Sequence, residues 1–178
     1  MSTVAIIGAG PLGRWLALAA ARAGYIVLLE DVMPANLHHA QEYLRQELGP
    51  AALPMVRFVS TIEDAVRDAD LAIDCIPDEI ESKLEILWLL DRMAPPRTVL
   101  ATPTKHLAIK DLAACTYRAD KCFAIAVDAR ELATREPKSG LDSELCLRTT
   151  TKTSEMAVAL VREFWERLGF SPRFEAEL

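Results

Sequence analysis

The chain has 178 residues, of which 51% are apolar, with ordinary proportions of Gly, Pro and charged residues. This composition predicts one globular domain with a single good core. A formal charge of −6 and a sequence without a basic tract argue against a nucleic acid partner. No apolar run approaches the roughly 20 residues of a membrane helix, and the early first strand leaves no room for a signal peptide. We therefore expect a cytoplasmic protein with no membrane partner.

The sequence predicts no metal site. The cysteines lack the spacing of metal ligands and fall mostly in apolar, strand-like runs, so we interpret them as small reduced core residues. They are Cys75, Cys115, Cys122 and Cys146.

The first predicted element is a buried strand over residues 4–7, followed by the sequence GAGPLG. Gly8, Gly10 and Gly13 have the GxGxxG spacing of a strand-to-helix turn that binds a dinucleotide. Gly8 permits the tight turn, Gly10 lets the backbone approach a pyrophosphate, and Gly13 lets the helix pack on the sheet. Pro11 fits the first helical turn, whose free N–H groups and positive dipole end form an anion site.

A second apolar strand, over residues 25–29, leads to Glu30 and Asp31, about 20 residues after the glycines. A carboxylate at this place accepts the ribose 2′-hydroxyl of NAD. No arginine follows in residues 32–37 to pair with a 2′-phosphate, which favours NAD over NADP. Because successive strand residues point to opposite faces, only one of the two acids can hold the ribose.

Strands and helices then alternate, which is the doubly wound α/β pattern of a mostly parallel sheet. We expect a helix over 35–48, a strand over 55–59, a short helix over 61–66, and strands over 71–76 and 98–101. The helix between the last two strands is predicted to bury one apolar face, which consists of Ile80, Leu84, Leu87 and Trp88.

Beyond Thr102 the pattern is less regular. It predicts a helix over 109–114, strands over 122–127 and 144–148, a charged loop over 129–143 between those strands, and a final strand near Arg173. The closing helix carries a stripe of Ala157, Leu160, Val161, Phe164 and Leu168, with Val158 and Trp165 beside it. This stripe is wider than a one-sided helix requires. It indicates either an irregular core or an exposed face for a homodimer or a partner chain.

Taken together, these segments resemble the NAD-binding domain of the 3-hydroxyacyl-CoA dehydrogenases. The resemblance covers almost the whole chain, in VAIIGAGPLGRWLALAAARAGYIVLLED, RFVSTIEDAVRDADLAIDCIPDEIESKLEIL, APPRTVLATPTKHLAIKDLA and LVREFWERLGFSP. It implies a single Rossmann-type domain over residues 1–178, with extra C-terminal strands after the sixth and without the helical C-terminal domain of the family. It also implies NAD as the cofactor and a place in fatty acid metabolism.

The resemblance implies a set of cofactor-binding residues. By position it assigns Asp31 to the adenosine ribose, and Asp78 and Lys83 to the nicotinamide side. The full set that we expect is Gly8, Gly10, Pro11, Leu12, Gly13, Asp31, Ile76, Pro77, Asp78, Lys83, Thr102 and Lys105.

The catalytic motifs of the family are altered. In the family, a histidine that opens an HFFNP motif removes the hydroxyl proton and is oriented by a glutamate. Here Ala126 stands in place of the histidine, Ala129 in place of the motif's asparagine, and Asp78 in place of the glutamate. The family's NTSS motif reads PTKH, so that its first serine has become Lys105.

Two functional hypotheses follow. The first is a pseudoenzyme, a regulatory or partner subunit that binds NAD(H) without dehydrogenase activity. In this hypothesis Lys105 beside the nicotinamide favours NADH, because oxidation places a positive charge on that ring. The second is an active NAD-dependent oxidoreductase for a hydroxyacyl or other hydroxy substrate. Its catalytic candidates are Lys105, His106 and Asp78, unless a separate chain completes the site.

Overall fold

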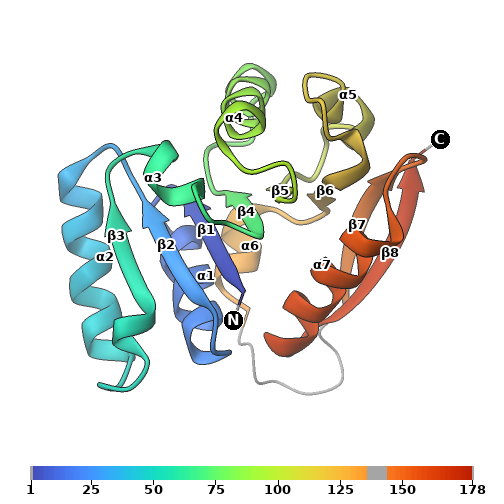
Figure 1. The fold of residues 1–178 in the computed structure, drawn as a ribbon. Helices are drawn as coiled ribbons and strands as arrows, with labels where there is room; N and C mark the ends of the chain where they lie inside the picture. Colours follow the sequence, from blue (N-terminus) through green and yellow to red (C-terminus); the bar gives the residue numbers. More distant parts are fainter. Residues whose placement is uncertain (1, 136–143, 178) are drawn as a thin grey trace.

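A computed structural model describes residues 2–135 and 144–177 (Figure 1). Its centre is an eight-stranded sheet of order β3-β2-β1-β4-β5-β6-β7-β8. The first six strands are parallel: β1 (Thr3–Ile7), β2 (Ile26–Glu30), β3 (Val56–Val59), β4 (Leu71–Asp74), β5 (Val99–Pro103) and β6 (Cys122–Ile125). β7 (Glu144–Thr150) is antiparallel to β6, and β8 (Ser171–Glu177) is parallel to β7. The predicted fold class, with its extra C-terminal strands, is confirmed.

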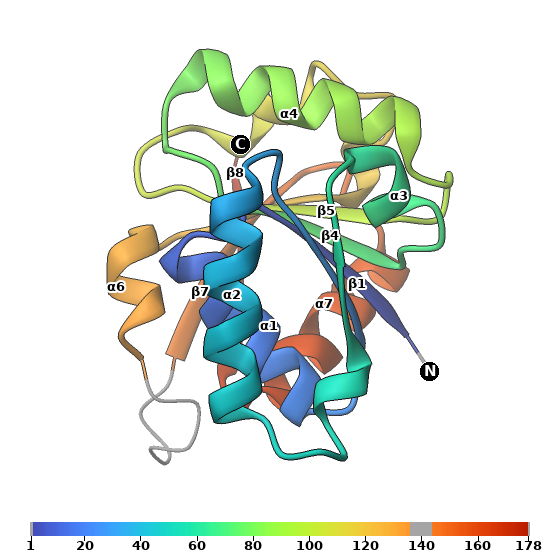
Figure 2. The ribbon, with the colours of Figure 1, turned by 90° about the vertical axis from the view of Figure 1, so that its left-hand side faces the viewer.

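Helices cover both faces of the sheet, and each face has its own apolar core. One face carries α1 (Pro11–Arg22), α2 (Pro34–Glu47), α6 (Ala129–Ala133) and α7 (Glu155–Arg167). The other carries α3 (Ile62–Val66), α4 (Ile80–Met93) and α5 (Ile109–Ala113). Figure 2 shows α4 on one side of the strands and α1, α2 and α7 on the other. Two short 3₁₀ helices, Leu53–Met55 and Ala119–Lys121, precede β3 and β6.

The strand order places a crevice at one edge of the sheet. The chain runs outward from β1 through β2 to β3, and then returns to lay β4 on the other side of β1. In open α/β sheets, ligands bind outside the carboxyl ends of the strands at such a switch point. We call this edge, where β1, β2, β4, β5 and β6 end, the carboxyl edge.

The predicted apolar face of α4 is only partly right, because Leu87 is buried and Leu84 packs against the core, but Ile80 and Trp88 do not. Ile80 and Trp88 are 37% and 45% exposed, whereas the buried side chains are Lys83, Ile86, Leu87 and Leu90. The helix is rotated from the expected orientation because Lys83 has a buried partner on β4 and can therefore face the sheet.

The structure bears on the two alternatives for the wide stripe of α7, because it buries Trp165 completely. Its ring lies edge-on to Phe164 and Phe170, with ring centroids 5.2 and 5.5 Å apart. The stripe is wide because α7 also contacts the turn that leads into β8. The alternative of an irregular core therefore fits the stripe around Trp165.

The charged loop expected over 129–143 begins as a helix. The Asp128 carboxylate accepts from the backbone N–H groups of Arg130 and Glu131, which caps α6. Leu132, which belongs to this helix, is fully buried. Residues 136–143 of the expected loop lie outside the described residues.

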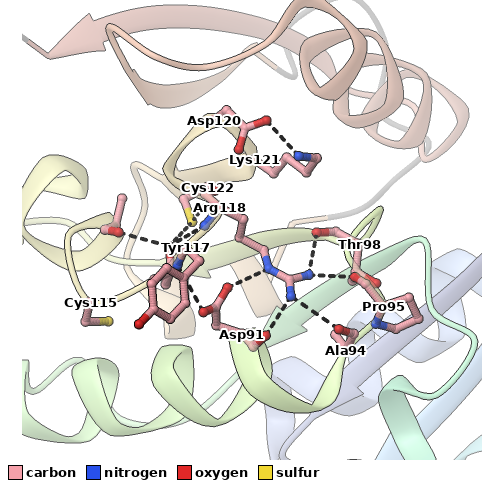
Figure 3. A network of polar contacts seen from close by, with 12 residues as sticks. Asp91, Ala94, Pro95, Thr98, Cys115, Tyr117, Arg118, Asp120, Lys121 and Cys122 are labelled. Atoms are coloured by element: carbon pink, nitrogen blue, oxygen red, sulfur yellow. Dashed lines mark hydrogen bonds and ion pairs between the residues drawn. The ribbon is translucent and has the colours of Figure 1, made fainter.

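Arg118 fastens the end of α4 to the start of β5, at the edge opposite the carboxyl edge (Figure 3). Its Nε donates to Asp91 Oδ1 at 2.7 Å, and Nη2 donates to the carbonyls of Asp91 and Ala94 at 2.6 and 3.2 Å. Nη1 donates to the carbonyls of Pro95 and Thr98 at 2.7 and 3.2 Å. All five guanidinium N–H groups are thus used, and two of them satisfy carbonyls that the helix end leaves without partners.

We predict that Arg118→Met lowers the free energy of unfolding by about 3–5 kcal/mol, because it leaves a buried Asp91 carboxylate without its cation. Urea unfolding measures the change. Arg97→Met is the control, because it removes a more exposed ion pair, with Asp70, that is worth about 1 kcal/mol or less. Equal losses in the two variants would contradict the prediction.

Candidate functional site

The turn between β1 and α1 is built around two close backbone contacts. Gly8 has a φ of +103°, a conformation that glycine adopts without a steric penalty. A Cβ on Gly13 would lie 1.8 Å from the Gly8 carbonyl oxygen, so only glycine lets α1 come this close. A Cβ on Gly10 would meet no atom within 4 Å, so there is open space over this part of the turn.

The N-terminus of α1 faces this open space. No side chain caps the helix, its first turn contains no acidic residue, and Pro11 stands at its start. Its first backbone N–H groups and the positive end of its dipole suit a pyrophosphate. Leu12, in contrast, is buried in the core with only its backbone near the turn.

The structure brings Asp31 to the same turn. Its Oδ2 accepts from the Ala9 N–H at 2.9 Å and from Asn36 Nδ2 at 3.1 Å, and its Oδ1 accepts from the Met33 N–H at 2.8 Å. A carboxylate has about four lone-pair sites, so about one remains for a ribose hydroxyl. No motif spacing in the sequence indicates the contact between Asn36 and Asp31, so the sequence analysis did not predict it.

Glu30 lies on the opposite face of the sheet and is 3% exposed. Its backbone carbonyl accepts from the Gly8 N–H at 2.8 Å, so its main chain supports the turn. Its Oε1 is buried without a hydrogen-bond partner. Burial, and then the neighbouring charge of Asp31, raise the pKa of Glu30 to about 7. Of the two acids, Asp31 is therefore placed to hold a ribose, and Glu30 is a buried acid below the site.

The loops after β4 and β5 carry other residues that the sequence analysis assigned to the site. Ile76 is partly buried, and Pro77, Asp78, Lys105 and His106 are exposed. Asp78 Oδ2 accepts from the Lys105 N–H at 3.2 Å, which joins the two loops at the carboxyl edge.

Two expected cofactor residues are enclosed by protein. Lys83 is fully buried, with its Nζ 2.6 Å from Asp74 Oδ1. Thr102 is also fully buried, and its side chain lies beside the Asp74 carboxylate. Neither side chain reaches the open part of the carboxyl edge, a result that the motif positions alone did not indicate.

The end of β6 carries no titratable side chain where the resemblance expects the catalytic histidine. Ala126 is partly buried, and its N–H donates to the Cys146 carbonyl of β7 at 2.9 Å. The three catalytic candidates, Asp78, Lys105 and His106, therefore lie elsewhere. They are on the loops after β4 and β5, and not beside Ala126 at the end of β6.

The cysteines are all free thiols, and burial raises the pKa of Cys122 to about 11. Within residues 2–135 and 144–177, no group of three His, Cys, Asp or Glu side chains could hold a metal ion. No helix in these two ranges is long and apolar enough to cross a membrane.

A 3-2-1-4-5-6 strand order, a glycine turn under a bare helix N-terminus and an acid at the end of β2 define the class of Rossmann dinucleotide-binding domains. More specifically, residues 3–126 match the family model "3-hydroxyacyl-CoA dehydrogenase, NAD binding domain", and the chain belongs to this family. The prediction of NAD as the cofactor is confirmed at the level of the family.

Among curated relatives, the chain is 30% identical over 135 residues to a probable 3-hydroxybutyryl-CoA dehydrogenase of Bacillus subtilis, covering 68% of this chain and 47% of the relative. It is 36% identical over 133 residues to an L-carnitine dehydrogenase of Burkholderia mallei, covering 69% and 41%. The chain therefore spans less than half the length of these relatives.

Solved structures agree on the fold. The (S)-3-hydroxybutyryl-CoA dehydrogenase of Ralstonia eutropha matches with a TM-score of 0.84 at 23% identity, covering 100% of this chain and 64% of that one. A diketoreductase matches with a TM-score of 0.82 at 26% identity, covering 100% and 65%.

Titration of the Glu30 carboxyl makes the free energy of unfolding depend on pH. Because the pKa of Glu30 in the folded protein, about 7, lies above its ordinary value of 4.5, the folded state holds this proton more tightly than the unfolded chain does. Its contribution to stability is complete below about pH 4.5 and is lost as the pH rises through about 7. We predict that wild type loses roughly 2 kcal/mol more than Glu30→Gln does between pH 5 and pH 8. Urea unfolding at both pH values measures the difference.

The control for this experiment is Glu85→Gln, which changes an exposed glutamate in the same way. It should follow the wild-type pH dependence. If Glu30→Gln follows it as well, the Glu30 carboxyl is not the group that titrates.

Proposed function

We propose that this chain binds NAD(H) through the glycine turn and Asp31, and does not itself catalyse the dehydrogenase reaction of its family. The observation that carries the proposal is the contrast between the two parts of the site. The turn, the helix N-terminus and Asp31 have the geometry that a dinucleotide requires. Ala126, in contrast, offers no group that can accept a proton where the resemblance implies the catalytic base.

The binding residues have distinct roles in this proposal. The first turn of α1 neutralises the pyrophosphate, and Asp31 orients the adenosine ribose by accepting from its 2′-hydroxyl. Asp31 would repel a 2′-phosphate, which supports a preference for NAD over NADP. When bound, NAD supplies a hydride acceptor. Without a base to take the hydroxyl proton, hydride transfer from a hydroxyacyl substrate is strongly slowed.

The proposed role is that of a regulatory or partner subunit in the cytoplasm that responds to the dinucleotide. A second candidate function is an active oxidoreductase of hydroxy substrates, including those of fatty acid metabolism. The contact between Asp78 and the Lys105 N–H favours this candidate, because it fixes the start of the Lys105–His106 segment at the carboxyl edge.

Gly10→Ala tests the binding site. The backbone of Gly10, with φ −69°, suits alanine, and the added Cβ meets no protein atom within 4 Å. The variant should therefore fold normally while its methyl group occupies the space of the pyrophosphate. We predict at least a tenfold weaker Kd for NADH by isothermal titration calorimetry.

Gly49→Ala is the matched control, because a Cβ there also meets no atom within 4 Å, and the residue lies beyond the far end of α2. It should bind NADH within about twofold of wild type. Wild-type affinity in Gly10→Ala would refute the proposed site.

A second measurement tests the chemistry. We predict that the chain oxidises 3-hydroxybutyryl-CoA, or reduces acetoacetyl-CoA, at least 10²-fold more slowly than a typical enzyme turnover of about 10 s⁻¹. Ala126→His alone should restore little, because the residues at the places of the orienting glutamate and the substrate serine also differ. The assay follows NADH absorbance.

Steady turnover near 10 s⁻¹ by the unmodified chain would instead establish the second candidate. Lys105→Met and His106→Gln would then show which of the two side chains transfers the proton.

A further inference from the structure

A buried ion pair lies directly below the carboxyl edge. Asp74 is the last residue of β4, Lys83 lies in the first turn of α4, and their side chains are 0% and 1% exposed. The Lys83 Nζ donates to Asp74 Oδ1 at 2.6 Å. The pair therefore closes the segment of residues 75–82, which consists of the loop after β4 and the first three residues of α4. We call this segment the 75–82 loop.

This loop forms a wall of the proposed dinucleotide site. At its start, the Cys75 N–H donates to the Ile7 carbonyl at 2.7 Å, and the Cys75 carbonyl oxygen lies 3.4 Å from where a Gly8 Cβ would stand. In its middle, Asp78 accepts from the Lys105 N–H. The loop thus contacts the glycine turn and the loop after β5, so its position affects both.

Stability does not explain this pair well. Burial is the largest effect on Asp74 and raises its pKa, although Lys83, the Thr102 hydroxyl on the adjacent strand β5 and the Ile76 N–H favour the charged form. Asp74 Oδ2 and Thr102 Oγ1 are buried without a hydrogen bond of normal geometry. A buried pair with such incomplete hydrogen bonding gains little over apolar side chains of similar volume. Removal of one partner, in contrast, leaves an uncompensated charge in the core.

We propose that Lys83 is a positioning residue, which acts on the dinucleotide site by closing the 75–82 loop through Asp74 and not by touching the cofactor. This inference rests on the proposed binding of NAD(H) at the carboxyl edge. It assigns to Lys83 a role different from the direct contact that its sequence position suggests. The cofactor meets the wall that the pair holds, and the ammonium stays below that wall.

A double-mutant cycle separates the two roles. The variants are Lys83→Met, Asp74→Asn and the double variant, with Lys121→Met as a control at the opposite edge of the sheet. Each is measured by urea unfolding and by NADH titration calorimetry on the folded protein. We expect at least a tenfold weaker NADH affinity in Lys83→Met, where the Asp74 charge is left alone. In the double variant we expect affinity within about threefold of wild type, because no unpaired charge distorts the loop.

Each outcome decides the inference. If Lys83 touches the cofactor, the double variant keeps the tenfold loss even though its fold is restored. If the pair is only structural, folded Lys83→Met binds NADH as wild type does, and the inference fails as well. Should Lys83→Met not fold, Asp74→Asn takes its place, because it leaves the Lys83 charge alone. A tenfold loss in Asp74→Asn that the double variant restores supports the inference, and wild-type affinity in Asp74→Asn overturns it. Failure of wild type to bind NADH would instead refute the proposed function.

Discussion

The contact between Gly13 and the Gly8 carbonyl is the constraint on which the rest of the site depends. A helix can approach the end of its own strand this closely only if the residue at the contact has no side chain. This approach fixes the direction of α1, and with it the place where the first N–H groups of the helix point. The Ala9 N–H then meets Asp31, the Gly8 N–H meets the Glu30 carbonyl, and the Cys75 carbonyl passes close to Gly8. Loops after β1, β2 and β4 are thus positioned by one backbone contact.

Local chemistry explains why much of the fold could be predicted from the sequence. Parallel strands such as β1 and β4 are buried on both faces and are therefore continuous apolar runs, and the glycine spacing identifies the turn whatever surrounds it. These signals lie within a few neighbouring residues. They give the order of the elements and the location of the carboxyl edge.

The parts that could not be predicted depend on tertiary partners. Apolar periodicity treats lysine as a surface residue, so it misplaced the buried face of α4, where Lys83 is neutralised by Asp74. It could not show that Trp165 would be enclosed by Phe170 from the next turn. It also could not decide between Glu30 and Asp31, because their difference is burial and not residue type.

Buried cations also hold α4 in place near both of its ends. Near its start, Lys83 holds Asp74 at the carboxyl edge, and at its end Arg118 holds Asp91 and the last carbonyls at the opposite edge. A helix of 14 residues spans about 21 Å, so these two anchors are far apart. Because neither anchor can shift without leaving a charge unpaired, α4 cannot tilt at one edge alone. Two buried ion pairs, one near each end, thus fix both the position and the direction of α4 on the sheet.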